Sequence, residues 1–161
     1  MDILKLLKPL SEFENNIGVL YKIFSESFAD DKAASSLFFL MSIQEESHRD
    51  IIEYQRRVIF ANRDHFQEVD ADPDIINDRL KEIEGMTVNA RARRVKIEDA
   101  VSFALRMEED ACEYYFKSLV AQSNPTFSKL VSKLGDGCAE HKDKLRELGE
   151  SLKAEPIVKA G

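Results

Sequence analysis

The sequence predicts an all-α protein, a four-helix bundle in which two antiparallel helix hairpins are joined by a long crossover. Two observations predict this fold. Apolar residues recur every three or four positions through four long segments, which is the pattern of one buried helix face. The two halves of the chain also carry chelating side chains in a similar order, as an internal duplication of a helix pair would. At 161 residues, the chain is expected to form one domain over residues 1–161.

The first hairpin is expected to consist of helices at about 10–29 and 33–61, separated by a short polar link that makes them antiparallel. Glu14 and Tyr21 lie on the apolar stripe of the first helix. Glu45 and His48 lie in the middle of the second stripe, where another apolar residue would be expected. A buried carboxylate is costly unless it is paired, protonated or bound to a metal, so metal binding is the first hypothesis.

The second half begins with a crossover at about 62–95, in which a short helix starts near Ile75 and is expected to end at Gly85. A third helix at about 96–122 follows, and Glu108, Cys112 and Tyr115 lie on its stripe. Asn124 and Pro125 form a specific helix-start signal, an N-cap followed by proline at the first helical position. The fourth helix, at about 125–152, has a nearly strict seven-residue apolar repeat, with Cys138 and His141 at core positions.

Spacing supports the duplication. Glu14 and Glu45 are 31 positions apart (45 − 14), and Glu108 and Cys138 are 30 positions apart (138 − 108). Residues three apart share one helix face, so Glu45 and His48 can approach one cation together, and His141 should do the same from the fourth helix. Gln44, Glu46 and Glu109 adjoin these residues in sequence but rotate off the stripes, so we interpret them as surface or helix-edge residues.

Composition excludes several classes of function. The net charge of -7 and pI near 5.1 argue against a nucleic-acid partner, and the basic cluster at 91–96 is interpreted as a solvated connection between helices. No run of about 18 apolar residues is present to span a membrane, and the first ten residues do not resemble a signal peptide. Two cysteines are too few for a disulfide framework, so a cytoplasmic location is expected. They form no Cys-x-x-Cys pair, so the sequence contains no rubredoxin-type iron site.

The ordered set of motifs resembles the rubrerythrin-like branch of the ferritin-like di-iron carboxylate proteins. The resemblance covers nearly the whole chain and rests on four elements: Glu14-x6-Tyr21, Glu45-x2-His48, Glu108-x6-Tyr115 and the partial match Cys138-x2-His141. It implies a ferritin-like bundle in which two helices each give one glutamate and the other two each give a Glu-x-x-His pair.

By this resemblance, Glu14 and Glu108 would be terminal ligands, Glu45 would bridge, and His48 and His141 would each supply one imidazole. Tyr21 and Tyr115 would hydrogen-bond the terminal carboxylates and fix their orientation. The alternative for both tyrosines is packing in an amphipathic core. No catalytic residue beyond the metal ligands, and no organic cofactor site, is implied.

Cys138 stands where the family pattern requires the second bridging glutamate. A thiolate is a softer ligand than a carboxylate and cannot bridge through two separate oxygens. If Cys138 is ionised, it adds a fourth negative charge to those of the three glutamates. If it remains a thiol, the site lacks a ligand, and a single metal, a zinc ion or an asymmetric pair is expected instead. Cys112 lies one turn after Glu108 and either faces this site or fills the core.

The resemblance implies a non-haem di-metal oxidoreductase, with iron as the cofactor and peroxide or dioxygen as the substrate. A separate electron-donor protein and a homodimer are expected partners. Two alternatives remain open: a metal-binding or iron-handling bundle without turnover, and a purely structural bundle whose site lost activity together with the bridging carboxylate. Metal content and peroxide-dependent oxidation of the reduced protein distinguish the three.

Overall fold

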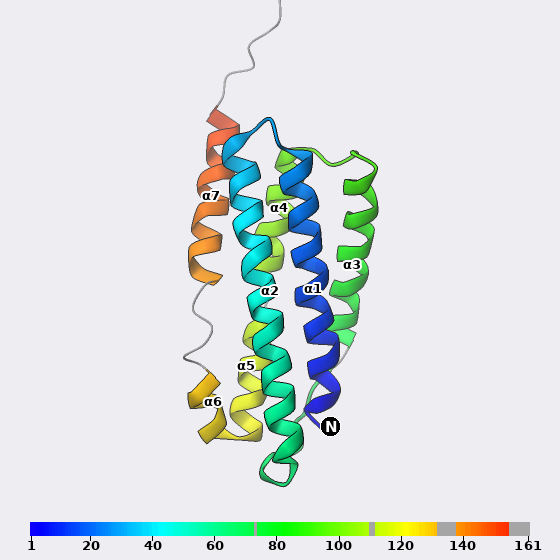
Figure 1. Ribbon diagram of the computed structural model, residues 1–161, viewed down its shortest axis with the longest axis vertical. Helices are drawn as coiled ribbons and strands as arrows, with labels where there is room; N and C mark the ends of the chain where they lie inside the picture. Colours follow the sequence, from blue (N-terminus) through cyan, green and yellow to red (C-terminus); the bar gives the residue numbers. More distant parts are fainter. Residues whose placement is uncertain (73, 110–111, 132–137, 155–161) are drawn as a thin grey trace, which may run out of the picture.

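The computed structural model describes residues 1–72, 74–109, 112–131 and 138–154. Within these residues the chain forms seven α-helices and no β-strand, so the all-α prediction is confirmed. Figure 1 shows the long helices running side by side along the long axis of the molecule. The elements are α1 (Leu4–Ser27), α2 (Lys32–Ala61), the 3-10 turn η1 (Arg63–His65), α3 (Asp74–Arg91), α4 (Ile97–Glu109), α5 (Cys112–Ser123), α6 (Pro125–Val131) and α7 (Cys138–Ala154).

Helices α1 and α2 form the antiparallel hairpin that the sequence predicts. Asp31 caps α2 by accepting a hydrogen bond from the Ala34 backbone N–H at 3.0 Å. Next to the turn, the Ser25 hydroxyl donates to the Ser35 carbonyl and the Ser35 hydroxyl donates to the Ser25 carbonyl, both at 2.9 Å. These reciprocal bonds fix the register of the two helices, which determines how Glu14 faces Glu45.

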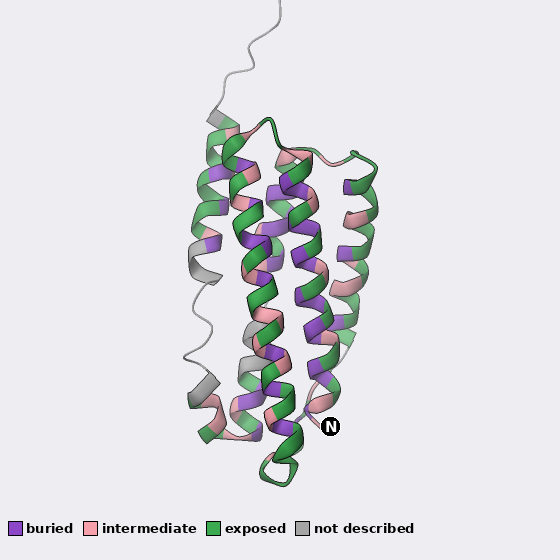
Figure 2. Cartoon of the chain, in the orientation of Figure 1, coloured by how far each residue is buried: buried purple, intermediate pink, exposed green. Residues whose placement is uncertain are grey.

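The core is apolar and lies along the inward faces of the helices (Figure 2). Its buried hydrophobic residues form one cluster that includes side chains from α1, α2, α3, α4, α5 and α7. Near the turn between α1 and α2, the rings of Phe24 and Phe38 lie 5.1 Å apart, and Tyr21 and Phe28 pack against Phe38. Burial of these large side chains holds α1 and α2 together immediately beside the buried carboxylates.

Helix α1 starts six residues earlier than the sequence predicts, at Leu4 rather than at about residue 10. The predicted helix began with the apolar stripe at Leu10, and Pro9, which has no N–H for an intrahelical hydrogen bond, directly precedes that stripe. Here Pro9 lies inside the helix. Leu6, Leu7 and Leu10 around it are almost fully buried, and their burial offsets the missing hydrogen bond.

The crossover also differs from the prediction, because α3 runs from Asp74 to Arg91 and does not end at Gly85. A Cβ atom built at Gly85 would meet nothing within 4 Å, so close packing does not require a glycine at this position of α3. Ile83 and Ala90, on either side of it, are buried. Helix α3 packs against α1 and forms part of the core.

The predicted third helix corresponds to α4 and α5, and the predicted fourth to α6 and α7; residues 110–111 and 132–137, between them, lie outside the described part. The predicted start signal is confirmed: α6 begins at Pro125, and the Asn124 side-chain oxygen accepts hydrogen bonds from the Thr126 and Phe127 N–H groups at 3.1 and 3.0 Å. Helix α4 packs against α7, α5 packs against α6, and α2 also contacts α7. This packing brings Glu108, Glu45 and His141 within reach of one another.

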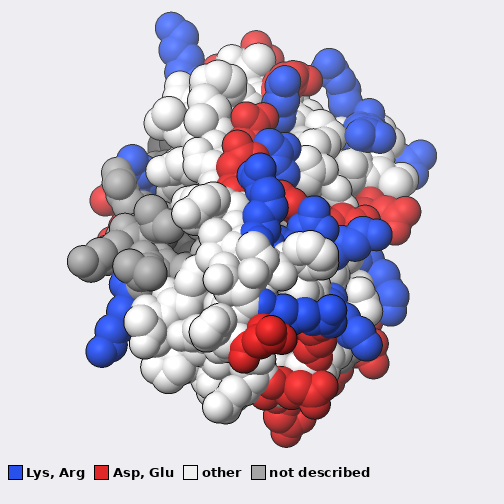
Figure 3. Space-filling view, turned by 60° about the horizontal axis from the view of Figure 1, so that its bottom comes forward, with Lys and Arg blue, Asp and Glu red and all other residues white. Residues whose placement is uncertain are grey.

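The outer surface carries charges of both signs. Figure 3 shows acidic and basic side chains interspersed over part of one face, beside a broad uncharged area. No helix in the described part of the chain is long and apolar enough to cross a membrane.

Candidate metal site

The first cluster of chelating side chains lies between α1 and α2. His48 Nδ1 is 3.0 Å from Glu45 Oε2 and 3.7 Å from Glu14 Oε2. Both carboxylate groups are buried, whereas the His48 side chain retains 14% exposure. One ligand atom from each residue lies within 4.8 Å of the others, so Glu14, Glu45 and His48 form a triad that we call the first triad.

The second triad contains Glu45 again, together with Glu108 from α4 and His141 from α7. His141 Nδ1 lies 3.6 Å from Glu108 Oε2. The His141 side chain is 2% exposed, so it is more deeply buried than that of His48. In both triads the Nδ1 atom faces the carboxylates, which gives the two halves of the chain matching geometry.

Glu45 belongs to both triads, and the packing of α1 places it there. A Cβ atom at Gly18 would lie 3.1 Å from the Glu45 Cβ and 3.4 Å from the Ser42 carbonyl oxygen. The glycine on α1 therefore allows the backbone to approach α2 at the level of Glu45. A carboxylate has two oxygens with lone pairs in different directions, so a residue shared between two triads is placed as a bridging ligand would be.

Tyr21 on α1 forms a hydrogen bond with Glu108 on α4. Its hydroxyl donates a hydrogen bond to Glu108 Oε1 at 3.0 Å, and the side chain is fully buried. Burial, followed by the negative charges of Glu108 and Glu45, raises the pKa of Tyr21 well above its ordinary value, so the phenol stays protonated and remains a donor. Glu108 is one of the two carboxylates that the family resemblance makes terminal.

The electrostatics favour a cation at this place. Burial raises the pKa of Glu45 well above its ordinary value, and the neighbouring charges of Glu14 and Glu108 add to this, while the hydrogen bond to His48 opposes it. Hydrogen bonds to Glu14 and Glu45 raise the pKa of His48 to about 11 despite its burial. The cluster thus holds protons tightly, because three buried carboxyl groups need positive charge nearby.

Two further features of these side chains suit a metal ion. His141 Nδ1 is buried and has no hydrogen-bond partner among the described residues, so no hydrogen bond competes with a cation there. Ligand atoms on one ion at about 2.0–2.2 Å can be at most about 4.4 Å apart, so triads within 4.8 Å need only a small contraction to close on an ion. Carboxylates with imidazoles suit divalent iron and zinc.

The structure therefore brings together five of the residues that the sequence singled out: Glu14, Glu45, His48, Glu108 and His141. Cys138 begins α7, and Cys112 and Tyr115 lie in α5, but the side chains of these three residues lie outside the described part. Their predicted roles remain predictions.

Gln44 makes a contact that the sequence did not predict. It is half-buried, as a helix-edge residue would be, and its side-chain oxygen contacts His141 Nε2. It lies next to Glu45 on α2, so helical periodicity rotates it away from the first triad. That rotation directs it toward α7, which a pattern confined to one helix does not reveal.

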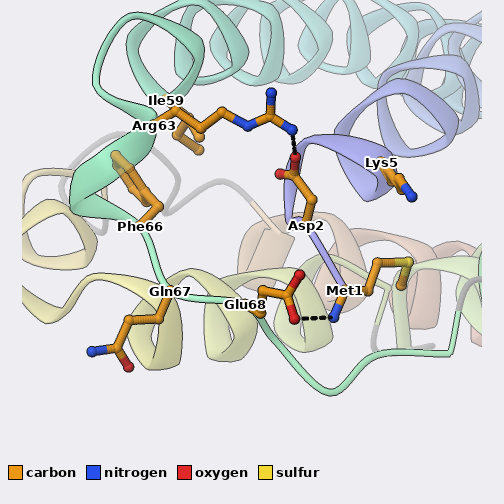
Figure 4. Close-up of a pocket in the computed structure, with 8 residues that line it drawn as sticks. All are labelled: Met1, Asp2, Lys5, Ile59, Arg63, Phe66, Gln67 and Glu68. Carbon is orange, nitrogen blue, oxygen red and sulfur yellow. Dashed lines mark hydrogen bonds and ion pairs between the residues drawn. The ribbon is translucent and has the colours of Figure 1, made fainter.

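The pocket in Figure 4 lies at the end of the bundle where the chain begins, and its lining shares no residue with the triads. Its volume is about 570 Å³. Asp2 pairs with Arg63 across it, and the Met1 amino group lies 3.9 Å from Glu68 and donates to the Val69 carbonyl. These contacts tie the start of α1 to the segment after α2.

Comparison of the chain with protein-family models, curated proteins and solved structures finds no match.

Proposed function

We propose that this protein is a rubrerythrin-like, non-haem di-metal protein that binds iron within a ferritin-like bundle and acts as an oxidoreductase on peroxide or dioxygen. The observation that carries the proposal is the position of Glu45, which lies in both triads and so connects two adjacent cation sites. Two such sites sharing a carboxylate suit a dinuclear centre better than a single structural ion.

Each residue has a distinct part in this proposal. Glu14 and His48 would hold one ion, Glu108 and His141 would hold the other, and Glu45 would be shared between them. Bound iron would supply the one-electron redox chemistry. Tyr21 keeps Glu108 oriented by its hydrogen bond, and the surrounding apolar side chains limit the access of water. Since the two cysteines of the chain form no Cys-x-x-Cys pair, electrons would come from a separate donor protein. The resemblance also favours a homodimer.

Cys138 favours a second candidate function, a metal-binding or iron-handling bundle without turnover. Its sequence position corresponds to the second bridging glutamate of the family pattern, and a lone thiol cannot bridge two ions through separate oxygens. A centre with one carboxylate bridge would hold its second ion less tightly. Zinc, or a single iron, fits such a site.

The test begins with anaerobic loading of the purified protein with ferrous ion, followed by removal of excess metal and metal analysis. The reduced protein is then mixed with peroxide or dioxygen, and oxidation is followed by its visible absorption. About two irons per chain and rapid oxidation by peroxide support the oxidoreductase. Tight metal binding without oxidation supports the second candidate.

The ligand assignment is tested by replacing Glu45 and His48 together with alanine, which is expected to abolish metal binding. Glu46→Ala is the matched control, because Glu46 is an exposed carboxylate one position from the bridge and belongs to neither triad. Full metal occupancy in the double variant would show that the ligands are misassigned.

A further inference from the structure

Gln44 connects α2 to the most buried imidazole of the site. Its side-chain oxygen contacts His141 Nε2, across the packing between α2 and α7. The His141 ring is almost completely removed from solvent, so water does not readily replace this partner. Its two ring nitrogens therefore depend on protein groups or on a bound cation.

A carboxamide oxygen can accept a hydrogen bond but cannot donate one. Its contact with Nε2 therefore requires that this nitrogen carry a proton, and in a neutral ring that leaves Nδ1 with a free lone pair. Nδ1 faces Glu108 at 3.6 Å and has no hydrogen-bond partner among the described residues. A lone pair directed at a carboxylate gains nothing from it, whereas a cation between the two atoms would interact with both.

We propose that Gln44 is a positioning residue that accepts the Nε2–H of His141 and so holds Nδ1 unprotonated toward the second triad. The inference rests on the proposed function, because it assigns that triad to a metal. Partners of this kind commonly fix the tautomer and orientation of a histidine ligand, and their loss typically costs 10- to 100-fold in metal affinity.

The dependence is specific to one half of the site. His48 is oriented through its Nδ1 contacts with Glu45 and Glu14, and its side chain keeps 14% exposure, so the first triad does not need Gln44. In the duplicated pattern, Gln44 precedes Glu45 as Gly137 precedes Cys138. Because glycine has no side chain to accept a hydrogen bond from His48, the duplicated pattern contains only one such glutamine, the one that contacts His141.

The first test measures the tautomer of His141 in the metal-free protein by long-range ¹H–¹⁵N NMR in mildly alkaline buffer. The wild-type ring is expected to carry its proton on Nε2. In Gln44→Leu the proton should move to Nδ1, where Glu108 can accept it. Gln44→Glu retains an acceptor and should restore the wild-type tautomer. Gln122→Leu, at an exposed position on α5, is the matched control. A wild-type ring protonated on Nδ1 would mean that the amide nitrogen faces it, and would overturn the proposal.

The second test titrates each protein with zinc alone by calorimetry. Gln44→Leu should weaken one of two binding steps by about 10- to 100-fold and leave the other unchanged, while Gln44→Glu and Gln122→Leu retain both. Equal affinities in Gln44→Leu and wild type would refute the positioning role. If Gln44→Leu does not fold, Gln44→Met preserves the length of the side chain. A wild-type protein that binds no zinc or iron would end the proposed function, whereas the tautomer measurement still decides what Gln44 does to His141.

Discussion

Metal binding should displace protons from this site, because its metal-free form holds them unusually tightly. The pKa of His48 is raised to about 11 by its hydrogen bonds to Glu14 and Glu45. At neutral pH its ring is therefore an imidazolium, and an ion can bind it only after that proton leaves. Burial chiefly raises the pKa of Glu45, so any proton that Glu45 holds would also leave when an ion binds.

The direction of the pH dependence follows from these shifts. Each proton released raises the apparent metal affinity about tenfold per pH unit, or about 1.4 kcal/mol. Between about pH 6.5 and 8, one proton from His48 gives a gain of roughly 30-fold, and any release from Glu45 adds to it. Because both pKa values are raised, the metal-free fold binds more protons than the unfolded chain, so its stability falls as pH rises. The contribution of His48 is complete below pH 6.5 and is lost through about pH 11.

The assay is calorimetric titration with zinc in buffers of equal pH and different ionisation enthalpy. The slope of observed enthalpy against buffer enthalpy gives the number of protons released. At pH about 7, at least about one proton should leave per chain, and His48→Gln should lower the total by about one. His65→Ala is the control, because His65 is an exposed histidine outside both triads. Enthalpies that do not depend on the buffer would refute the imidazolium interpretation of the first triad.

The remaining predictions concern four single substitutions. Gly18→Ala should lower the free energy of unfolding by about 1–3 kcal/mol, measured with denaturant, because the new Cβ would lie 3.1 Å from the Glu45 Cβ. Gly85→Ala should raise the free energy of unfolding by about 1 kcal/mol, because the space around that position is open. Tyr21→Phe should cost the metal-free protein about 1.5–3 kcal/mol by removing the hydrogen bond to Glu108; an unchanged unfolding midpoint would contradict that bond. Cys138→Glu should raise iron stoichiometry toward about two per chain after identical anaerobic loading, unless the natural protein already binds two equally tightly.

The sequence predicts the long helices well because their apolar stripes are regular. Glu14, Glu45 and His48 interrupt those stripes, and a costly buried group is visible in sequence as such an interruption. The errors have local causes. A proline disfavours a helix interior, yet Pro9 lies within α1, which extends to Leu4 with the leucines around Pro9 buried. Tertiary packing overrode the local signal there, as it did at Gly85.

Contacts between helices are what the sequence does not reveal. Tyr21 and Glu108 are 87 positions apart, and Gln44 and His141 are 97 apart, so neither hydrogen bond follows from the periodicity of a single helix. The duplicated motifs nevertheless indicate which helices should meet, because ligands of one centre must converge. A functional constraint thus predicts contacts that propensity and patterning alone do not.

The position of Glu45 also bears on how Cys138 would affect the proposed centre. The second triad consists of Glu45, Glu108 and His141, whose ligand atoms lie within 4.8 Å of one another. Replacement of a bridging glutamate by cysteine would therefore leave a place for a second ion but remove one of its bridges. On this proposal, Cys138 would control how tightly the second ion is held and how symmetric the pair is, while Glu45 would control whether a pair forms at all.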